Sequence, residues 1–163
     1  MRNSSACLSQ PDDMMEKERT WTDKYQVNWH EADFRGNATL TTLCNFMQES
    51  AWRHAGHMGF GYEDALRLNQ FWIVLRWFIK IDRYPKWQEN ILIETWPRMP
   101  ERLFALRDYT LTDADGRQLG AATSTWMLLD ARTRRPQKLE LVEGFLHLTS
   151  ERSALGENAQ KIL

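Results

Sequence analysis

The hydrophobic period of the sequence changes once, near residue 70. Between 40 and 57, apolar residues recur at the three- and four-residue spacing of an amphipathic helix. From 73 to 130 they alternate at a period of two, in segments joined by short turns. Tight turns allow only antiparallel neighbours, so this order predicts an α+β domain in which one long helix packs on an antiparallel sheet.

The individual elements follow from the same patterns. The expected strands cover 21–31, 73–81, 91–96, 102–112 and 118–130, and the expected helices cover 40–57 and 63–69. Thr39 or Thr41 is expected to cap the long helix, and Pro97 and Pro100 to mark a connection between strands. One helix covers only the concave face of a sheet, so the edge strands and the other face are expected to pair with a second copy.

The chain has 163 residues, which is the size of one domain. We expect the folded domain to cover 21–138, and 139–163 to form a C-terminal extension with helical character. Residues 1–20 lack both periodicity and the apolar stretch of a secretion signal. They are therefore expected to form a mobile tail, in which Met14 or Met15 is an alternative start of translation.

Composition argues against several classes of partner. With 21 Lys+Arg and 22 Asp+Glu the net charge is −1, which gives no global field to attract nucleic acid or an anionic membrane. Cys7 and Cys44 stand in unrelated contexts, which argues against a disulfide framework and favours a reducing, cytoplasmic setting. The longest apolar run, 71–81, is broken by Arg76 and Lys80 and falls short of the ~20 residues of a membrane helix. A soluble protein is expected.

Aromatic side chains are abundant. The chain carries eight tryptophans, more than an ordinary core of this size needs. They either build an aromatic core among the strands, or part of their surface lines a cavity or an interface.

Several common catalytic motifs are missing from the sequence. It contains no G-x-S-x-G, no G-x-x-x-x-G-K-[ST] and no C-x-x-C, which argues against a serine-elbow hydrolase, a P-loop phosphotransferase and a thioredoxin-type protein. His54 and His57 with Glu49 are a weak candidate for a metal site, because no further ligand lies nearby. Capping or core histidines are the alternative, and no metal or cofactor is expected.

Two carboxylates accompany the long helix. Asp33 lies in the turn before it, and Glu49 lies three turns along it. An acid beside the free N–H groups of a helix N-terminus combines a base that activates water with donors that bind a developing oxyanion, as acyl transfer requires. The alternative is that Asp33 is simply a cap, a common role for acids before helices.

Several segments of the sequence together carry a family resemblance. They are the run 33–60, FWIVLR at 71–76, YPKW at 84–87, ETWP at 94–97, Arg107-Asp108, STW at 124–126 and TRRP at 133–136. Over about 25–138 the chain thus resembles the acyl-acyl carrier protein (acyl-ACP) thioesterase family of plants and bacteria. The resemblance implies the hotdog fold, a long helix wrapped by an antiparallel sheet. It also implies hydrolysis of fatty acyl thioesters of acyl carrier protein or coenzyme A, in fatty acid biosynthesis.

The sequence departs from this family in two respects. Family members carry two hotdog domains, and this chain resembles the amino-terminal half alone, so a homodimer or a dimer of dimers is expected. In the plant enzymes the catalytic set lies in the second half, as Asp, Asn two on, His two further on, and a Glu in the following helix. Asp33 and Glu49 match the two acids, whereas Arg35 and Asn37 replace the Asn and the His. The resemblance therefore implies a simpler scheme, in which Asp33 or Glu49 activates water.

Substrate contacts are expected along the helix and after the fifth strand. Phe46 is expected to line the acyl chain together with Trp72 or Trp77, and Asn37 is expected to contact the substrate. A basic cluster is either a solvated face or a contact for an acidic carrier protein or the phosphates of coenzyme A. The basic cluster comprises Arg132, Arg134, Arg135 and Lys138.

Two other functions stay open at this point. A non-catalytic acyl-binding hotdog module would keep the pocket without turnover, and the missing histidine favours it. A hotdog dehydratase or hydratase would pair a histidine with an acid, and Asn37 in the histidine position argues against it.

Overall fold

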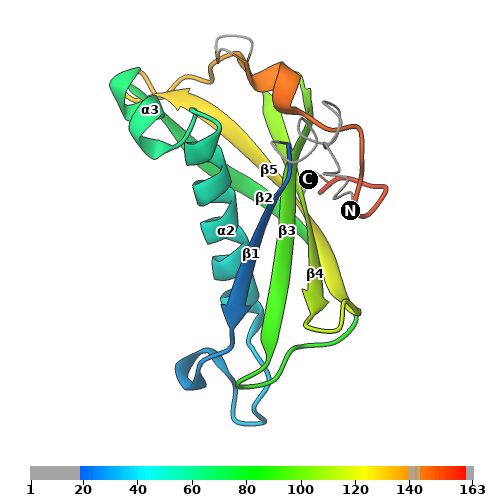
Figure 1. Ribbon diagram of the computed structural model, residues 1–163. Coiled ribbons are helices and arrows are strands. Elements are labelled where there is room, and N and C mark those ends of the chain that lie inside the picture. Colours follow the sequence, from blue (N-terminus) through cyan, green and yellow to red (C-terminus); the bar gives the residue numbers. More distant parts are fainter. Residues whose placement is uncertain (1–18, 140–141, 143, 161–163) are drawn as a thin grey trace, which may run out of the picture.

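The computed structural model describes residues 19–139, 142 and 144–160, and in these residues one long helix lies on a five-stranded sheet (Figure 1). The elements are β1 (Trp21–Gln26), the 3₁₀ helix η1 (Trp29–Glu31), α2 (Leu40–His57), α3 (Tyr62–Arg67), β2 (Gln70–Ile81), β3 (Asn90–Glu101), β4 (Phe104–Asp113), β5 (Gln118–Asp130) and the 3₁₀ helix η3 (Phe145–Leu148). The predicted α+β architecture is confirmed. The predicted tail, apart from its last two residues, lies outside the described part, as do Met14 and Met15.

The sheet is antiparallel throughout, with the strand order β1-β3-β4-β5-β2. β1 and β2 are its edges, and each pairs with one neighbour. The β4–β5 hairpin turns at Asp113, whose Oδ1 accepts the backbone N–H groups of Asp115 at 3.0 Å and Arg117 at 2.9 Å. Gly116 in this turn has φ +79°, a conformation that a residue with a side chain rarely adopts. The turn therefore joins β4 and β5, two inner strands of the sheet.

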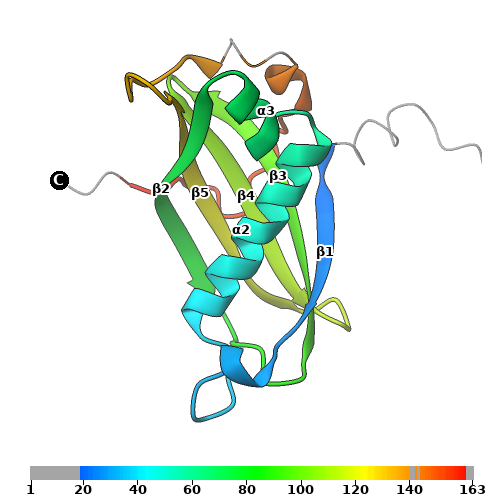
Figure 2. The same ribbon diagram turned by 90° about the vertical axis from the view of Figure 1, so that its left-hand side faces the viewer.

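Helix α2 packs across one face of the sheet (Figure 2). Thr39 caps it, because its Oγ1 accepts the N–H of Thr42 at 3.1 Å. The buried face of the helix includes Leu43 and Met47, which contribute to the main core together with Ile91 of β3. Truncation of a side chain as deeply buried as Leu43 to alanine costs about 2–5 kcal/mol of stability. The apolar spacing that predicts the helix is thus the same spacing that anchors it to the sheet.

The first strand is shorter than predicted. The prediction of a strand over 21–31 is wrong beyond Gln26, because the chain turns into η1. The Glu31 carboxylate accepts the backbone N–H of Asn28 at 2.7 Å, which closes a tight turn. Trp29 therefore does not continue the strand face but lies exposed, edge-on to Trp87 with the ring centroids 5.0 Å apart.

The third strand is longer than predicted, since β3 runs through both prolines. The expectation that Pro97 and Pro100 mark a connection is wrong. β1 begins opposite Thr95, so no strand of the described residues pairs with β3 on that side beyond this point. The Ser150 N–H donates to the Pro97 carbonyl there at 2.9 Å, and the missing N–H of proline breaks no ladder bond. The turn to β4 instead falls at Arg102, which has φ +58°.

Residues 152–160 of the C-terminal extension lie on the sheet face opposite α2, as both ribbon views show, whereas η3 packs beside α3, with the Phe145 ring 5.2 Å from that of Phe60. The backbone N–H of Ala154 donates to Asp108 Oδ2 at 2.6 Å, and Arg98 donates to Asn158 Oδ1 at 2.6 Å. The expected helical character is limited there to η3, a single 3₁₀ turn. In the described residues, no helix is long and apolar enough to cross a membrane.

Candidate functional site: an aromatic cavity beside helix α2

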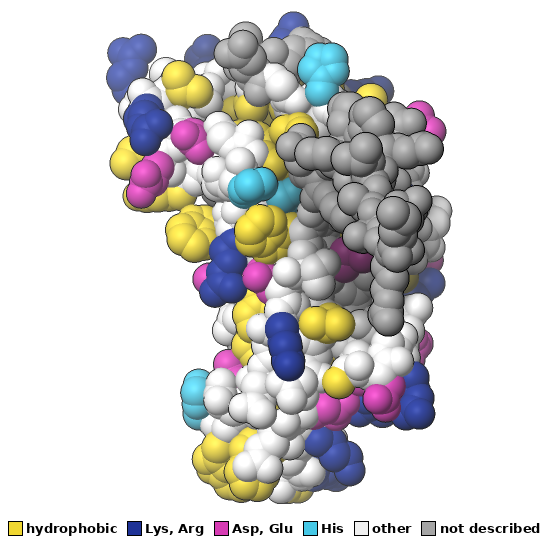
Figure 3. All heavy atoms as spheres, viewed as in Figure 1, with side chains coloured by type: hydrophobic (Ala, Val, Ile, Leu, Met, Phe, Trp, Pro, Cys, Tyr) yellow, Lys and Arg dark blue, Asp and Glu magenta, His cyan; other side chains and the backbone are white. Residues whose placement is uncertain are grey.

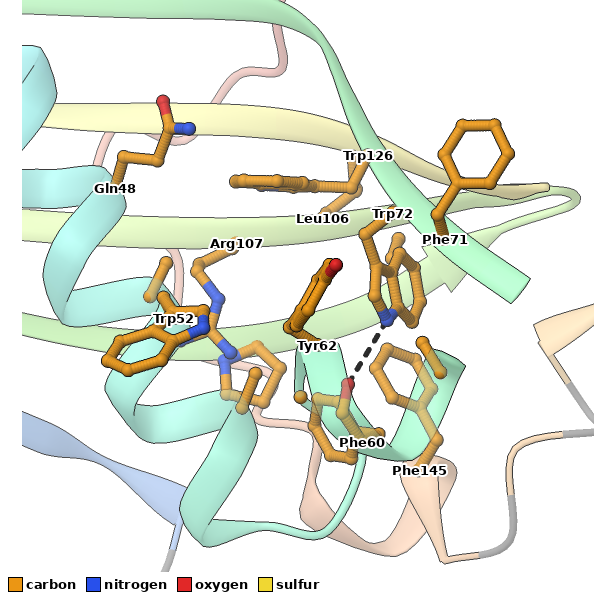
Figure 4. A pocket seen from close by; sticks show the side chains of 16 residues that line it. Gln48, Trp52, Phe60, Tyr62, Phe71, Trp72, Leu106, Arg107, Trp126 and Phe145 are labelled. Atoms are coloured by element: carbon orange, nitrogen blue, oxygen red, sulfur yellow. Dashed lines mark hydrogen bonds between the residues drawn. The ribbon is translucent and has the colours of Figure 1, made fainter. Parts of the chain in front are cut away.

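A cavity of about 430 Å³ lies between the second half of α2, the short helix α3 and the sheet (Figure 4). Gln48, Trp52 and Ala55 face it from α2 at helical spacing, and β2, β4 and β5 supply the opposite wall. Its volume falls within the range of ordinary small-molecule sites. The cavity is therefore large enough for an extended apolar ligand.

The inner wall of the cavity is aromatic. Trp72 of β2 and Trp126 of β5 line it together with Phe60 and Phe145. The indole N–H of Trp72 donates to the Phe60 carbonyl at 3.1 Å, and that of Trp126 donates to Ser124 Oγ at 2.6 Å. Because these polar edges are bonded within the protein, the ring faces are left to present apolar surface to a ligand.

Two large residues at the cavity are exposed to solvent. Trp52 is 57% exposed and Tyr62 is 63% exposed, although both line the cavity. Apolar side chains that are exposed together around one cavity commonly mark a binding surface, whereas single ones do not. They mark the mouth of the cavity, between α2 and α3.

A charged side chain lies deep in the same cavity. Arg107 of β4 lines it and is only 6% exposed. Its Nη1 donates to His54 Nδ1 at 3.1 Å and to Thr95 Oγ1 at 3.2 Å. Burial lowers the pKa of the Arg107 guanidinium, because an apolar surrounding disfavours the charged form.

The predicted catalytic residue Asp33 lies at the other end of the helix, in the loop between η1 and α2. Its Oδ1 accepts the backbone N–H groups of Arg35 at 2.8 Å and Asn37 at 3.0 Å. The carboxylate thus holds its own turn, while Thr39 caps the helix. Phe34 beside it is 92% exposed.

Glu49, the other predicted catalytic residue, faces away from the cavity on the side of β1. Its Oε1 accepts from Arg53 Nε at 3.1 Å, and Arg53 also bonds Asp23 of β1 at 3.3 Å. Glu49 lies ten residues beyond the Thr39 cap, a rise of about 15 Å along the helix. No hydrogen bond among the described residues joins Glu49 to Asp33, so the structure does not bring the two acids together within one chain.

One of the predicted substrate-binding residues lines the cavity, and the others lie elsewhere. Trp72 is in the cavity wall. Phe46 stacks on Tyr25 with ring centroids 4.4 Å apart, and Trp77 packs against Tyr109 at 5.2 Å. Asn37 lies in the Asp33 loop.

The basic cluster follows β5 and is exposed at all four positions. Asp130 orders the turn before it, because its Oδ1 accepts the backbone N–H groups of Arg132 at 3.1 Å and Thr133 at 2.6 Å. Within the described part of the chain, none of the four basic side chains forms an ion pair. Their charges are therefore free to meet a partner.

The histidines of the weak metal candidate have other surroundings. His54 is buried against Arg107 and stacks on Trp21 at 5.9 Å, and His57 also packs on Trp21. Among the residues that the structure describes, no three His, Cys, Asp or Glu side chains gather as a metal site requires.

The sequence interpretation did not identify Trp52 or Tyr62 as site residues, and it considered Arg107 only as a possible addition to the basic cluster, not as part of a cavity. Arg107 carries a visible signal, since it is the one charge in the inward-facing alternation that runs from Ala105 to Leu111. Trp52 also carries a signal in the sequence, because it is a large aromatic residue on the polar side of helix α2. Tyr62 carries none, because its role depends on how α3 folds back against β2.

Comparison with known proteins gives the family context. The sequence profile of the family "Acyl-ACP thioesterase N-terminal domain" matches residues 18–143. The chain is 34% identical over 133 residues to oleoyl-acyl carrier protein thioesterase 2, chloroplastic, of Arabidopsis thaliana, covering 77% of this chain and 36% of that protein. The chain thus spans about a third of the length of this relative.

Solved structures agree with that match. An acyl-ACP thioesterase from Bacteroides thetaiotaomicron superposes with a TM-score of 0.81 at 27% identity, over 91% of this chain and 60% of that one. A putative oleoyl thioesterase from Lactobacillus plantarum superposes with a TM-score of 0.69 at 31% identity, over 76% of this chain and 48% of that one. The predicted hotdog fold is confirmed.

Proposed function

The chain belongs to the acyl-ACP thioesterase family, and from this we propose that it hydrolyses fatty acyl thioesters, with the acyl group held in the aromatic cavity. The observation that carries this proposal is the cavity itself, which is apolar, aromatic and opens between Trp52 and Tyr62. Burial of each methylene in such a site stabilises the complex by about 0.8 kcal/mol, so chain length is read by the depth of the cavity.

The reaction centre in this proposal lies at the N-terminus of α2. No hydrogen bond of the described residues uses the N–H groups of Leu40 and Thr41, which leaves two donors for a thioester oxyanion. Asp33, in the adjoining loop, activates the attacking water in this proposal; Glu49, about 15 Å along the same helix, takes this role only if a second copy brings its own Glu49 to this end. The activated water adds to the carbonyl carbon, and the carbon–sulfur bond breaks to release the carboxylic acid and the thiol.

A second copy of the chain completes the site. Apolar side chains gather at the end of the molecule that carries the Asp33 loop (Figure 3), including Trp29, Phe34 and Trp87. The β2 edge is also unpaired within the described residues, and Leu75 on it is 39% exposed. Both features suit a homodimer, or a dimer of dimers, that covers the reaction centre and excludes water.

The remaining parts of the proposal concern the carrier and the location. The basic cluster binds the acidic carrier protein or the phosphates of a coenzyme A substrate. We place the reaction in the cytoplasm, where a free cysteine such as Cys44 stays reduced. The curated relatives in plants are named as chloroplastic.

A second candidate function is an acyl-binding module without turnover. The observation that favours it is the engagement of both acids, since Asp33 holds its turn and Glu49 pairs with Arg53. Such a module would bind acyl thioesters in the same cavity and release no thiol.

Thiol release from a panel of acyl-ACP and acyl-coenzyme A thioesters, from short to long chains, tests the proposal. Ala55→Phe places a ring in the cavity and should lower kcat/KM for long chains at least tenfold while sparing short ones. Ala114→Phe makes the same change on an exposed turn and should have no effect. Release of no thiol from any substrate would overturn hydrolysis. Equal chain-length profiles for the two variants would overturn the assignment of the cavity.

A further inference from the structure

Arg107 is a buried cation that has no counter-charge among the described residues. It is 6% exposed, and no carboxylate of the described residues forms an ion pair with it. The next residue, Asp108, is on the opposite face of β4, where it accepts from Thr123 Oγ1 at 2.8 Å and from the Ala154 N–H. A charge taken out of water without a partner is costly, so proteins rarely keep one without a use for it.

One edge of the guanidinium is unused. Nη1 makes both hydrogen bonds of the side chain, to His54 and Thr95, and no hydrogen bond of the described residues uses Nε or Nη2. Guanidinium nitrogens only donate, so His54 Nδ1 accepts and does not compete for a ligand oxygen. Nε–H and Nη2–H lie side by side on the same edge, which is the fork that binds both oxygens of a carboxylate.

This unused edge has access to the cavity. Arg19 Nε is the one side-chain nitrogen or oxygen in the described part of the chain that is both fully buried and without a hydrogen bond. Nε and Nη2 of Arg107 also make no hydrogen bond to the described residues, but they are not fully buried. Nε and Nη2 of Arg107 therefore keep accessible surface, and Arg107 lines the cavity while being nearly closed to the exterior. Figure 4 shows Arg107 on the same side of the sheet as Trp52 and Tyr62, which form the mouth.

We propose that the Nε–Nη2 edge of Arg107 binds the carboxylate of an aliphatic chain that lies in the cavity. The inference rests on the proposed function and adds the chemical class of the ligand end. Two sources supply this chemistry. One is a carboxylate at the far end of the acyl group of a thioester, and the other is a free fatty acid that enters with its head inward.

Calorimetric titration of the whole chain with four ligands tests the proposal and separates the two sources. The free-acid pair is decanoate and decanol. The thioester-like pair is the decyl thioether of pantetheine, which cannot be hydrolysed, and the same thioether with a carboxylate at its far end. At about pH 8 both carboxylates are ionised, so each pair differs in one charged group.

We expect at least one carboxylate ligand to bind about tenfold or more tightly than its uncharged counterpart, because a charge-assisted pair is worth about 1.5–3 kcal/mol. Arg107→Met should abolish this preference and leave decanol binding within about threefold. Arg117→Met, at an exposed hairpin position, should keep the preference. Preference for decanoate alone would identify the free acid as the source. Preference within the thioether pair would identify an acyl group with a terminal carboxylate.

Two results would overturn the inference, and they are distinguishable. If decanol and the decyl thioether bind but neither carboxylate binds better, the role of Arg107 is wrong and the proposed function stands. If none of the four ligands binds, the acyl-binding cavity itself is wrong. Should Arg107→Met fail to fold, the comparison within each pair on the unaltered chain still decides between these results.

Discussion

The two ends of helix α2 differ in almost every physical respect. At its N-terminus lie N–H groups with no hydrogen-bond partner in the described part of the chain, an acid in a polar loop and exposed aromatic side chains such as Phe34. Along its second half lie a 430 Å³ cavity, aromatic walls and the buried Arg107. The N-terminal end therefore carries a candidate base and oxyanion donors but does not line the cavity. The second half lines the cavity, whose wall contains no carboxylate in the described residues.

This difference shows how one hotdog domain divides its tasks. The cavity is enclosed by elements of a single chain, so one domain holds it ready for a ligand. The acid end is open to solvent, and a reaction there needs a cover that excludes water and strengthens the electrostatics. A second copy that pairs through β2 and the apolar end supplies this cover in our account.

The largest expected effect is at the acid end. Asp33→Asn keeps Oδ1, so the turn that accepts the N–H groups of Arg35 and Asn37 survives, but the base is lost. Thiol release should fall at least about a hundredfold with unchanged circular dichroism. Glu49→Gln tests the other acid, and a hundredfold fall there alone would place the base in the middle of the helix. If neither variant loses activity, no carboxylate of this end is the base.

The next effect concerns the cover. Leu75→Asp places a charge on the free edge of β2, where it should oppose pairing with a second copy. We expect light scattering to change from dimer to monomer and thiol release to fall about tenfold or more, while acyl binding in the cavity persists. Arg117→Asp, on an exposed turn, is the matched control. A monomeric unaltered chain with full activity would refute this part of the account.

A smaller effect is expected at the basic cluster. Arg135→Glu should raise KM about threefold to tenfold for a carrier-protein substrate, because exposed charges steer association weakly. The effect should vanish at high salt and be absent for a pantetheine thioester, which has no acidic protein surface. Arg117→Glu should change neither substrate. An equal effect on both substrates would show that the cluster does not recognise the carrier.

The smallest expected effect is on stability at the N-terminus of α2. Thr39→Ala removes the oxygen that accepts the Thr42 N–H and should lower the free energy of unfolding by about 1 kcal/mol in urea. Thr41→Ala, one residue into the exposed first turn, should change it by less than about 0.5 kcal/mol. Equal losses would show that the cap does not define this end of the helix.

The sequence predicts the regular elements well wherever one periodic pattern determines them. The helix over 40–57 and the strand over 118–130 have the bounds that the structure gives to α2 and β5. The errors fall where a local contact overrides the period, as the Glu31 carboxylate does by closing a turn within an alternating segment. The prediction at Pro97 is wrong for a different reason. A proline interrupts a strand only where a neighbouring strand would accept its missing N–H, and the strand order decides whether such a neighbour is present.

The site was less accessible to prediction than the fold. Trp72 was identified, but the cavity depends on α3 folding back against β2, which no local pattern records. Phe46 and Trp77 have the right chemistry and lie elsewhere in the core. Arg107 stands out in the sequence as a charge at an inward-facing strand position, but only the folded structure shows that its side chain is buried.

The position of the acyl chain is the central claim, and photo-crosslinking tests it most directly. The probe is an S-alkyl pantetheine with a diazirine at the far end of a ten-carbon chain, irradiated with the whole chain and mapped by peptide mass spectrometry. Labels on cavity residues such as Trp52, Phe60 and Ala105, displaced by excess decanol and lost in Ala55→Phe, are the predicted result. Labels confined to the Asp33 loop or to the opposite face of the sheet would contradict the account.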